Sequence, residues 1–257
     1  PVVGLVLGAG SARGLAHIGV LQVLKEEEIG FDFIVGSSMG AMVGAIYASG
    51  ADLYMLEKML DSMNTNMMID VQVPRFGFVA GKRVDSFLTL LTKNKNFDQL
   101  DPPVIAVATD LISGQRVIFD QGPVTEAVRA SISIPGVFTP VLKDDMVLVD
   151  GAVIDRLPVE VARHRGADII IAVDVTFGPD KKVTIKNTID VIMTSLDIMQ
   201  KLHFNLCESQ ADILIQPAVG NFTARDFEST REIIALGRAA TLDKVKEIKQ
   251  VISDFKS

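Results

Sequence analysis

Short apolar segments alternate with longer segments of helical periodicity along most of the chain. The short segments lie at residues 2–7, 31–35, 104–109, 116–119, 146–149, 168–175 and 212–216, and their β-branched and aromatic content is typical of strands. Helices are predicted near 15–28, 39–48, 187–206 and 227–252. Nearly continuous apolar runs such as 169–173 indicate strands buried on both faces. The pattern predicts an α/β fold, a three-layer α/β/α sandwich with a mostly parallel central sheet.

Residues 52–97 interrupt this alternation. The segment holds methionines at helical spacing and then an apolar loop: Met55, Met59 and Met63, followed by Met67, Met68, Phe76 and Phe78. The methionine stripe either packs on the core or forms a mobile cap whose apolar face meets acyl chains. We expect one domain over residues 1–257, with 52–97 as a cap-like insertion and 180–257 adding C-terminal helices and one strand.

The composition narrows the class of protein. The chain has 257 residues, 48% of them hydrophobic, which suits one large core better than two small ones. The net charge of −7 and the scattered basic residues argue against nucleic acid and against electrostatic attraction to anionic lipid. Any membrane contact would therefore be hydrophobic, and no apolar run reaches the length of a membrane-spanning helix.

Two features bear on the compartment. Cys207 is the single cysteine, so an internal disulfide is excluded, and a packed apolar role is expected for it. The chain opens on a strand without an initiator methionine, so the lack of a signal peptide at its start carries no weight. We expect a cytoplasmic protein with peripheral membrane contact through an apolar surface as an option, and no expectation of oligomeric state follows.

The pentapeptide at 36–40, Gly-Ser-Ser-Met-Gly, stands between a predicted strand and a predicted helix. At average glycine and serine usage such a G-x-S-x-G pattern arises in roughly one in ten chains of this length, so the context decides its value. A serine at a strand-to-helix turn matches the nucleophile elbow, in which the flanking glycines permit the strained turn. Ser38 Oγ would then lie at a helix N-terminus, which favours negative charge.

The first glycine-rich turn, residues 8–14, has three interpretations. A dinucleotide site fits poorly, because Arg13 occupies a position that needs a small residue, and no acidic residue closes a second strand about 20 residues on. An oxyanion hole fits better, since such a turn presents unpaired N–H groups at one point. The third interpretation is a tight turn without chemistry.

A serine nucleophile needs a base. None of the three histidines, His17, His164 and His203, falls in the loop after a late strand where a hydrolase histidine is usually held, so each is expected to be structural. Three aspartates end apolar runs instead: Asp110, Asp150 and Asp174. Asp150 has the best context because Gly151 and Ala152 follow it, yet spacing alone does not choose among the three.

Four separated blocks resemble the bacterial patatin-like phospholipases, in family order. They are 7–14 with 16–21; 36–40; Ala130 and Ser131 with Pro135, Phe138 and Pro140; and 150–152 with Leu157 and Pro158. The resemblance runs from about residue 3 to residue 175, and the four blocks together are highly specific. Many members have Gly where Ala9 and Ser11 stand here and Asn where Arg156 stands, which affects the loop geometry and the support of Asp150.

The resemblance implies a Ser–Asp dyad without histidine, with Ser38 as nucleophile and Asp150 as its partner. It places the oxyanion hole on the glycine loop that begins at Gly8. Its donors would be the backbone N–H groups of Gly10, Ser11 and Ala12, assisted by that of Met39, with Arg13 shaping the loop.

The implied function is hydrolysis of lipid acyl esters of the phospholipase or lysophospholipase type, without metal or cofactor. Two alternatives stay open: an acyltransferase using the same site, and a non-catalytic regulator or adaptor on the same fold.

Overall fold

In the computed structural model the described residues are 1–63, 77–79, 81–176, 183, 185, 188–208 and 210–255. Several expectations lie outside the described parts. They are those on Met67, Met68 and Phe76, and on the side chains of Phe78, His203 and Cys207.

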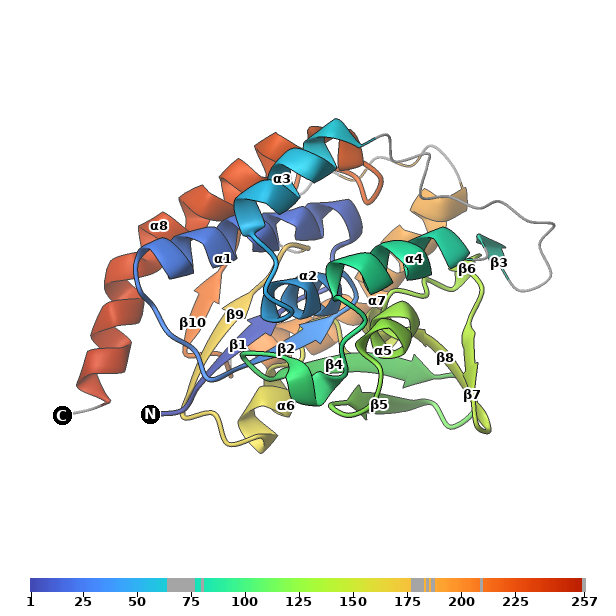
Figure 1. Cartoon of the computed structure of the whole chain (residues 1–257), viewed down its shortest axis with the longest axis horizontal. Coiled ribbons are helices and arrows are strands. Elements are labelled where there is room, and N and C mark those ends of the chain that lie inside the picture. The colour runs from blue at the N-terminus through green and yellow to red at the C-terminus, as the bar shows by residue number, and fades with distance from the viewer. Residues whose placement is uncertain are drawn as a thin grey trace.

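The central sheet confirms the predicted α/β architecture (Figure 1). Its strand order is β10 (Ile213–Ile215), β9 (Ile169–Val173), β1 (Val3–Leu7), β2 (Phe33–Ser37), β4 (Val104–Asp110), β8 (Met146–Asp150) and β7 (Val141–Lys143). The strands from β10 to β4 are parallel. The β8 and β7 strands, and β5 (Gln115–Phe119) on β4, pair antiparallel. A separate parallel pair joins β3 (Gly77–Val79) and β6 (Gly136–Phe138).

Helices cover both faces of the sheet, so the strands are apolar on both sides. One face carries Leu5, Ile34 and Ile171 into a core shared with α1 (Ala16–Glu26), α2 (Met39–Ala48), α5 (Val124–Ser131) and α8 (Thr230–Asp254). The opposite face turns Val6 and Ile170 toward α6 (Val159–His164). The other helices of the described residues are α3 (Leu53–Ser62), α4 (Lys82–Leu91), α7 (Thr188–Glu208) and the short turns η1 (Ser11–Leu15), η3 (Phe97–Gln99), η4 (Gly151–Val153) and η5 (Phe227–Ser229).

The described part of the predicted insertion begins with α3, which packs beside α1 and α8 (Figure 1). Of its two methionines, one fits packing on the core and the other is exposed, as the cap interpretation requires. Met59 packs against the core, as a structural stripe requires, whereas the Met55 side chain is 69% exposed. Among the described helices, none combines the length and the apolar character needed to cross a bilayer.

The pairing register brings the ends of β2 and β8 together. One edge of β4 pairs with β5, and the opposite edge is shared by β2 and β8. Ser37, the last residue of β2, lies opposite Val107, and Asp150, the last residue of β8, lies opposite the next residue, Ala108. Since β2 and β8 run in opposite directions, their carboxyl ends meet on this edge.

Candidate active site

Ser38 occupies a strained turn between β2 and α2. Its φ of 53° and ψ of −122° lie outside the usual regions for a residue with a side chain. Two glycines make the turn feasible because the chain approaches other backbone there. A Cβ on Gly36 would lie 2.4 Å from the Ala41 nitrogen, and one on Gly40 would lie 2.0 Å from the Leu7 carbonyl oxygen. The strand-to-helix turn that the sequence predicts is therefore present, with Ser38 at the start of α2.

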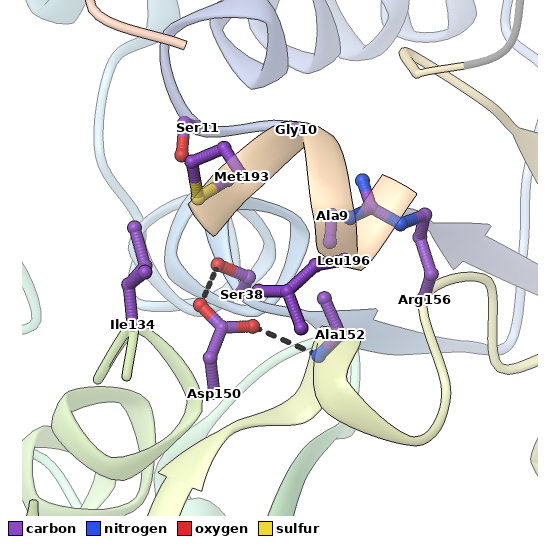
Figure 2. Close-up of a pocket in the computed structure, with 10 residues that line it drawn as sticks. All are labelled: Ala9, Gly10, Ser11, Ser38, Ile134, Asp150, Ala152, Arg156, Met193 and Leu196. Carbon is purple, nitrogen blue, oxygen red and sulfur yellow. Dashed lines mark hydrogen bonds between the residues drawn. The ribbon is translucent and has the colours of Figure 1, made fainter. Parts of the chain in front are cut away.

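Asp150 is the carboxylate that the structure brings to Ser38. Ser38 Oγ donates to Asp150 Oδ2 at 2.6 Å, and the Ala152 backbone N–H donates to Oδ1 at 2.8 Å (Figure 2). Both partners are nearly inaccessible, with exposures of 5% for Ser38 and 3% for Asp150. Burial raises the pKa of Asp150 to about 6, although the Ser38 and Ala152 hydrogen bonds and the positive charge of Arg156 act in the opposite direction. The carboxyl group thus titrates close to neutral pH, where it can exchange a proton.

The glycine loop lies against the same cavity. Ser11 and Met39 are the first residues of η1 and α2, and the first N–H groups of a helix have no acceptor within it. Gly10 precedes η1 and lines the cavity together with Ser11. Ala12 differs from the expectation, because its N–H donates to the Ala224 carbonyl at 3.2 Å. The N–H groups that remain candidate donors are those of Gly10 and Ser11 in the loop and that of Met39 at the start of α2.

Two further loop residues have structural contacts. The Gly8 N–H donates to the Val173 carbonyl at 3.1 Å, which joins the loop to the end of β9. Arg13 is buried, with 4% exposure, and its Nη2 lies 3.6 Å from Asp197 Oδ2 on α7. Burial is the main cause that lowers the pKa of Arg13 from its usual value. The Arg13 guanidinium thus lies against Asp197 of α7.

The cavity beside Ser38 is small. Its volume of about 10 Å³ corresponds to about one water molecule. Apart from the residues already described, apolar side chains form its walls: Ala9, Ile134, Ala152, Met193 and Leu196. Met193 and Leu196 come from α7 and lie over Ser38 in Figure 2. Access for a larger molecule requires some of these side chains to move.

Comparisons with known proteins bear on the family of this chain. The family model described as patatin-like phospholipase matches residues 5–163, more than half of the chain. This chain belongs to the patatin-like phospholipase family. It is 38% identical over 177 residues to an uncharacterized NTE family protein of Mycobacterium tuberculosis, covering 68% of this chain and 49% of that protein. It is 28% identical over 270 residues to the rat patatin-like phospholipase domain-containing protein 7, covering 91% of this chain and 20% of the relative.

Solved structures give the same fold. VipD from Legionella pneumophila superposes with a TM-score of 0.64 at 13% identity, covering 95% of this chain and 66% of the VipD chain. The patatin-like chain described here thus spans about half the length of its mycobacterial relative and a smaller share of the rat protein.

In this patatin-like protein, the histidines His17 and His164 are hydrogen-bonded to backbone carbonyls. His17 is buried against the glycine loop, with Nε2 2.7 Å from the Gly8 carbonyl oxygen, and burial lowers its pKa to about 4. The ring is therefore neutral at physiological pH, and its Nε2–H donates to that carbonyl. His164 Nδ1 lies 3.0 Å from the Glu160 carbonyl oxygen, within α6.

Asp110 and Asp174 each bind backbone N–H groups of their own turns. Asp110 accepts from Ile112 and Ser113 and from the Ser113 hydroxyl, which is the largest cause that lowers its pKa to about 2. Asp174 accepts from the Thr176 N–H. Of the three aspartates that spacing left open, Asp150 is the one whose carboxylate accepts a hydrogen bond from Ser38 Oγ.

Sequence reasoning missed the residues that position the pair. The Ser131 hydroxyl donates to the Val107 carbonyl at 2.6 Å and accepts from the Ser38 N–H at 2.8 Å. Thr109 Oγ1 donates to the Asp150 carbonyl at 3.0 Å. The Ala130–Ser131 block of the resemblance was a signal for Ser131. No sequence signal marked Thr109 or the α7 side chains. Among the described residues, no cluster of three His, Cys, Asp or Glu side chains is arranged to hold a metal ion.

Proposed function

We propose that the protein is a serine acyl-ester hydrolase acting on lipids, of the phospholipase or lysophospholipase type, through the Ser38–Asp150 pair. The observation that carries the proposal is the buried 2.6 Å hydrogen bond from Ser38 Oγ to Asp150 Oδ2 at the N-terminus of α2. Membership of the patatin-like phospholipase family supports a lipid substrate. The side chains that line the cavity are mainly apolar, as contact with an acyl chain would require once they move apart.

The first half of the reaction forms an acyl-enzyme. Ser38 Oγ attacks the ester carbonyl carbon while Asp150 Oδ2 takes the hydroxyl proton. The carbonyl oxygen becomes an oxyanion, which accepts hydrogen bonds from the N–H groups of Gly10, Ser11 and Met39. The bond to the alcohol oxygen then breaks, and the alcohol leaves with the proton that Asp150 returns. One such donor is worth about 3–4 kcal/mol in a well-studied serine protease.

The second half regenerates the enzyme. A water molecule attacks the acyl carbon, and Asp150 accepts its proton. The carbonyl–Oγ bond breaks, the proton passes from Asp150 to Ser38 Oγ, and the fatty acid leaves. A carboxylate with an ordinary pKa near 3.9 is a weak base for serine. The raised pKa of Asp150, about 6, makes its carboxylate a stronger base for accepting the Ser38 hydroxyl proton.

Labelling with a fluorophosphonate probe tests the proposal directly. Peptide mass spectrometry is expected to find one phosphonate per chain on Ser38, and Ser38→Ala is expected to abolish it. Asp150→Asn keeps the shape of the side chain but removes its basicity, so labelling and ester hydrolysis are expected to fall at least 100-fold. Asp110→Asn, which alters another strand-end aspartate, serves as the matched control and is expected to react at the wild-type rate. A folded wild-type protein that stays unlabelled would refute the proposal.

The choice between hydrolysis and acyl transfer rests on the acceptor. Products from a phospholipid are analysed with and without added lysolipid or glycerol. Release of free fatty acid in both conditions is expected for a hydrolase, whereas acylated acceptor as the main product would identify a transferase.

A further inference from the structure

A carboxylate on α7 joins two buried arginines beside the site. Asp197 Oδ1 lies 2.7 Å from Arg156 Nη2, and Asp197 Oδ2 lies 3.6 Å from Arg13 Nη2. All three side chains are buried, with exposures of 6% for Asp197, 4% for Arg13 and 3% for Arg156. The contacts of the Asp197 carboxylate with the two arginines therefore link α7 with η1 and with the segment that follows Asp150.

Arg156 holds the glycine loop by two routes. Its backbone carbonyl accepts from the Ala9 N–H at 2.9 Å. Its Nη1 donates to Thr176 Oγ1 at 3.0 Å, and that hydroxyl donates to the Ala9 carbonyl at 2.7 Å. The N–H and the carbonyl of Ala9 are thus both hydrogen-bonded, one by the Arg156 backbone and the other by a hydroxyl that Arg156 contacts. Ala9 lies next to Gly10, whose N–H is a proposed oxyanion donor.

Asp197 also offsets unfavourable charge. Arg13 and Arg156 repel each other, and burial makes each charge more costly. Asp197 and Asp174 are the negative groups that favour the charged form of Arg13. The neighbouring residue Leu196 lines the cavity, so the contact that balances the arginines also keeps α7 over Ser38.

We propose that Asp197 is a positioning residue for the Ser38–Asp150 site, because its carboxylate holds Arg13 and Arg156 and through them the glycine loop. This inference rests on the proposed function. It predicts an electrostatic effect as well as a geometric one. Arg156 favours the ionised form of Asp150, and Asp197 weakens that influence by partly neutralising Arg156.

The test is the rate of fluorophosphonate labelling of Ser38 as a function of pH. Asp197→Asn is expected to lower the plateau rate at least tenfold, because the loop loses its support. It is also expected to shift the acid limb of the pH–rate profile, the range in which the labelling rate falls as the pH falls, to lower pH by about half a unit or more. Without the charge of Asp197, Arg156 acts on Asp150 unopposed. Arg156→Gln is expected to move the limb to higher pH, and the double variant to return it toward the wild-type position.

Two further variants control for a general effect of altering α7. Asp190→Asn neutralises another buried carboxylate of this helix and is expected to leave the limb in place. Asp197→Glu keeps the charge but shifts it by one methylene, so a lower plateau with an unshifted limb is expected. If Asp197→Asn does not fold, Asp197→Glu carries the test, and a wild-type plateau in that variant overturns the inference.

The outcomes separate the inference from the proposed function. Wild-type protein without label on Ser38, or label that survives Asp150→Asn, would sink the proposed function and the inference together. Label on Ser38 that is lost in Asp150→Asn, combined with a folded Asp197→Asn variant whose limb stays at the wild-type pH, would overturn the inference alone.

Discussion

Replacing Asp150 by Asn is expected to stabilise the fold increasingly as the pH rises. Asp150 has a pKa of about 6 in the folded protein, above its ordinary value of 3.8, and burial is the main cause. Ionising this carboxylate therefore costs more in the folded than in the unfolded state. The folded protein thus loses stability as the pH rises through the interval between the two pKa values, and the loss is complete above about pH 7.

The size of the effect follows from the two pKa values. Their difference of about 2.2 corresponds to about 3 kcal/mol at neutral pH. Roughly 1 kcal/mol of this is already present at pH 4.5, so about 2 kcal/mol develops between pH 4.5 and pH 8. The asparagine does not titrate. The free energy of unfolding of Asp150→Asn minus that of the wild type should therefore rise by about 2 kcal/mol over this range.

Urea unfolding of both proteins at intervals from pH 4.5 to pH 8 measures this difference. Its slope with pH is the test, because altered hydrogen bonds at the asparagine add a term that does not vary with pH. Asp110→Asn is the matched control. The pKa of Asp110 is lowered to about 2, so its carboxylate stays ionised in both states above pH 5, and its difference from wild type should be flat there and negative. A flat or falling difference for Asp150→Asn would refute the assignment of Asp150 as a buried, destabilising base.

Three further predictions concern activity. The kcat/KM for a soluble ester should fall tenfold per pH unit below about pH 6, because Asp150 must be ionised to accept a proton; a constant value from pH 5 to pH 8 would contradict this. Gly151→Ala should reduce kcat/KM about 100-fold, since its Cβ would lie 2.3 Å from the Val107 carbonyl oxygen and displace Asp150. The control is Gly30→Ala, which has open space around the new Cβ and should retain the wild-type kcat/KM. Leu196→Ala should enlarge the small cavity and raise the labelling rate of a long-chain fluorophosphonate severalfold relative to that of a short one. Ile198→Ala alters an exposed residue of the same helix and should leave the ratio of the two labelling rates unchanged.

The parts of the fold with strong local patterns were predictable. The apolar runs identified the parallel strands, and the glycines around Ser38 identified the elbow. The eight-residue α5 was missed because about two turns carry too little periodicity. The antiparallel pairing of β8 was also missed. Asp150 therefore reaches Ser38 from a strand that runs antiparallel to β4.

In the site, too, contacts between residues close in sequence were predictable, whereas contacts between residues far apart in sequence were not. A serine three residues after Asp110 is a local signal that this aspartate binds its own turn, and it could have removed one candidate. The contact of Asp197 with Arg13 joins residues 184 positions apart (197 − 13), and no local pattern encodes it. Likewise, no local pattern marked the α7 side chains that line the cavity beside Ser38, and the cap predicted at 52–97 lies partly outside the described residues.

The shared edge of β4 makes the chemistry sensitive to strand register. Because side chains alternate along a strand, a slip of β8 by one residue would place Val149 or Gly151 opposite Ala108 and turn the Asp150 carboxylate to the other face of the sheet. The hairpin of β7 and β8 forms the end of the sheet, where local opening costs least. Substitutions in β7, remote from Ser38 along the chain, would then act as inactivating mutations that leave every proposed catalytic group intact.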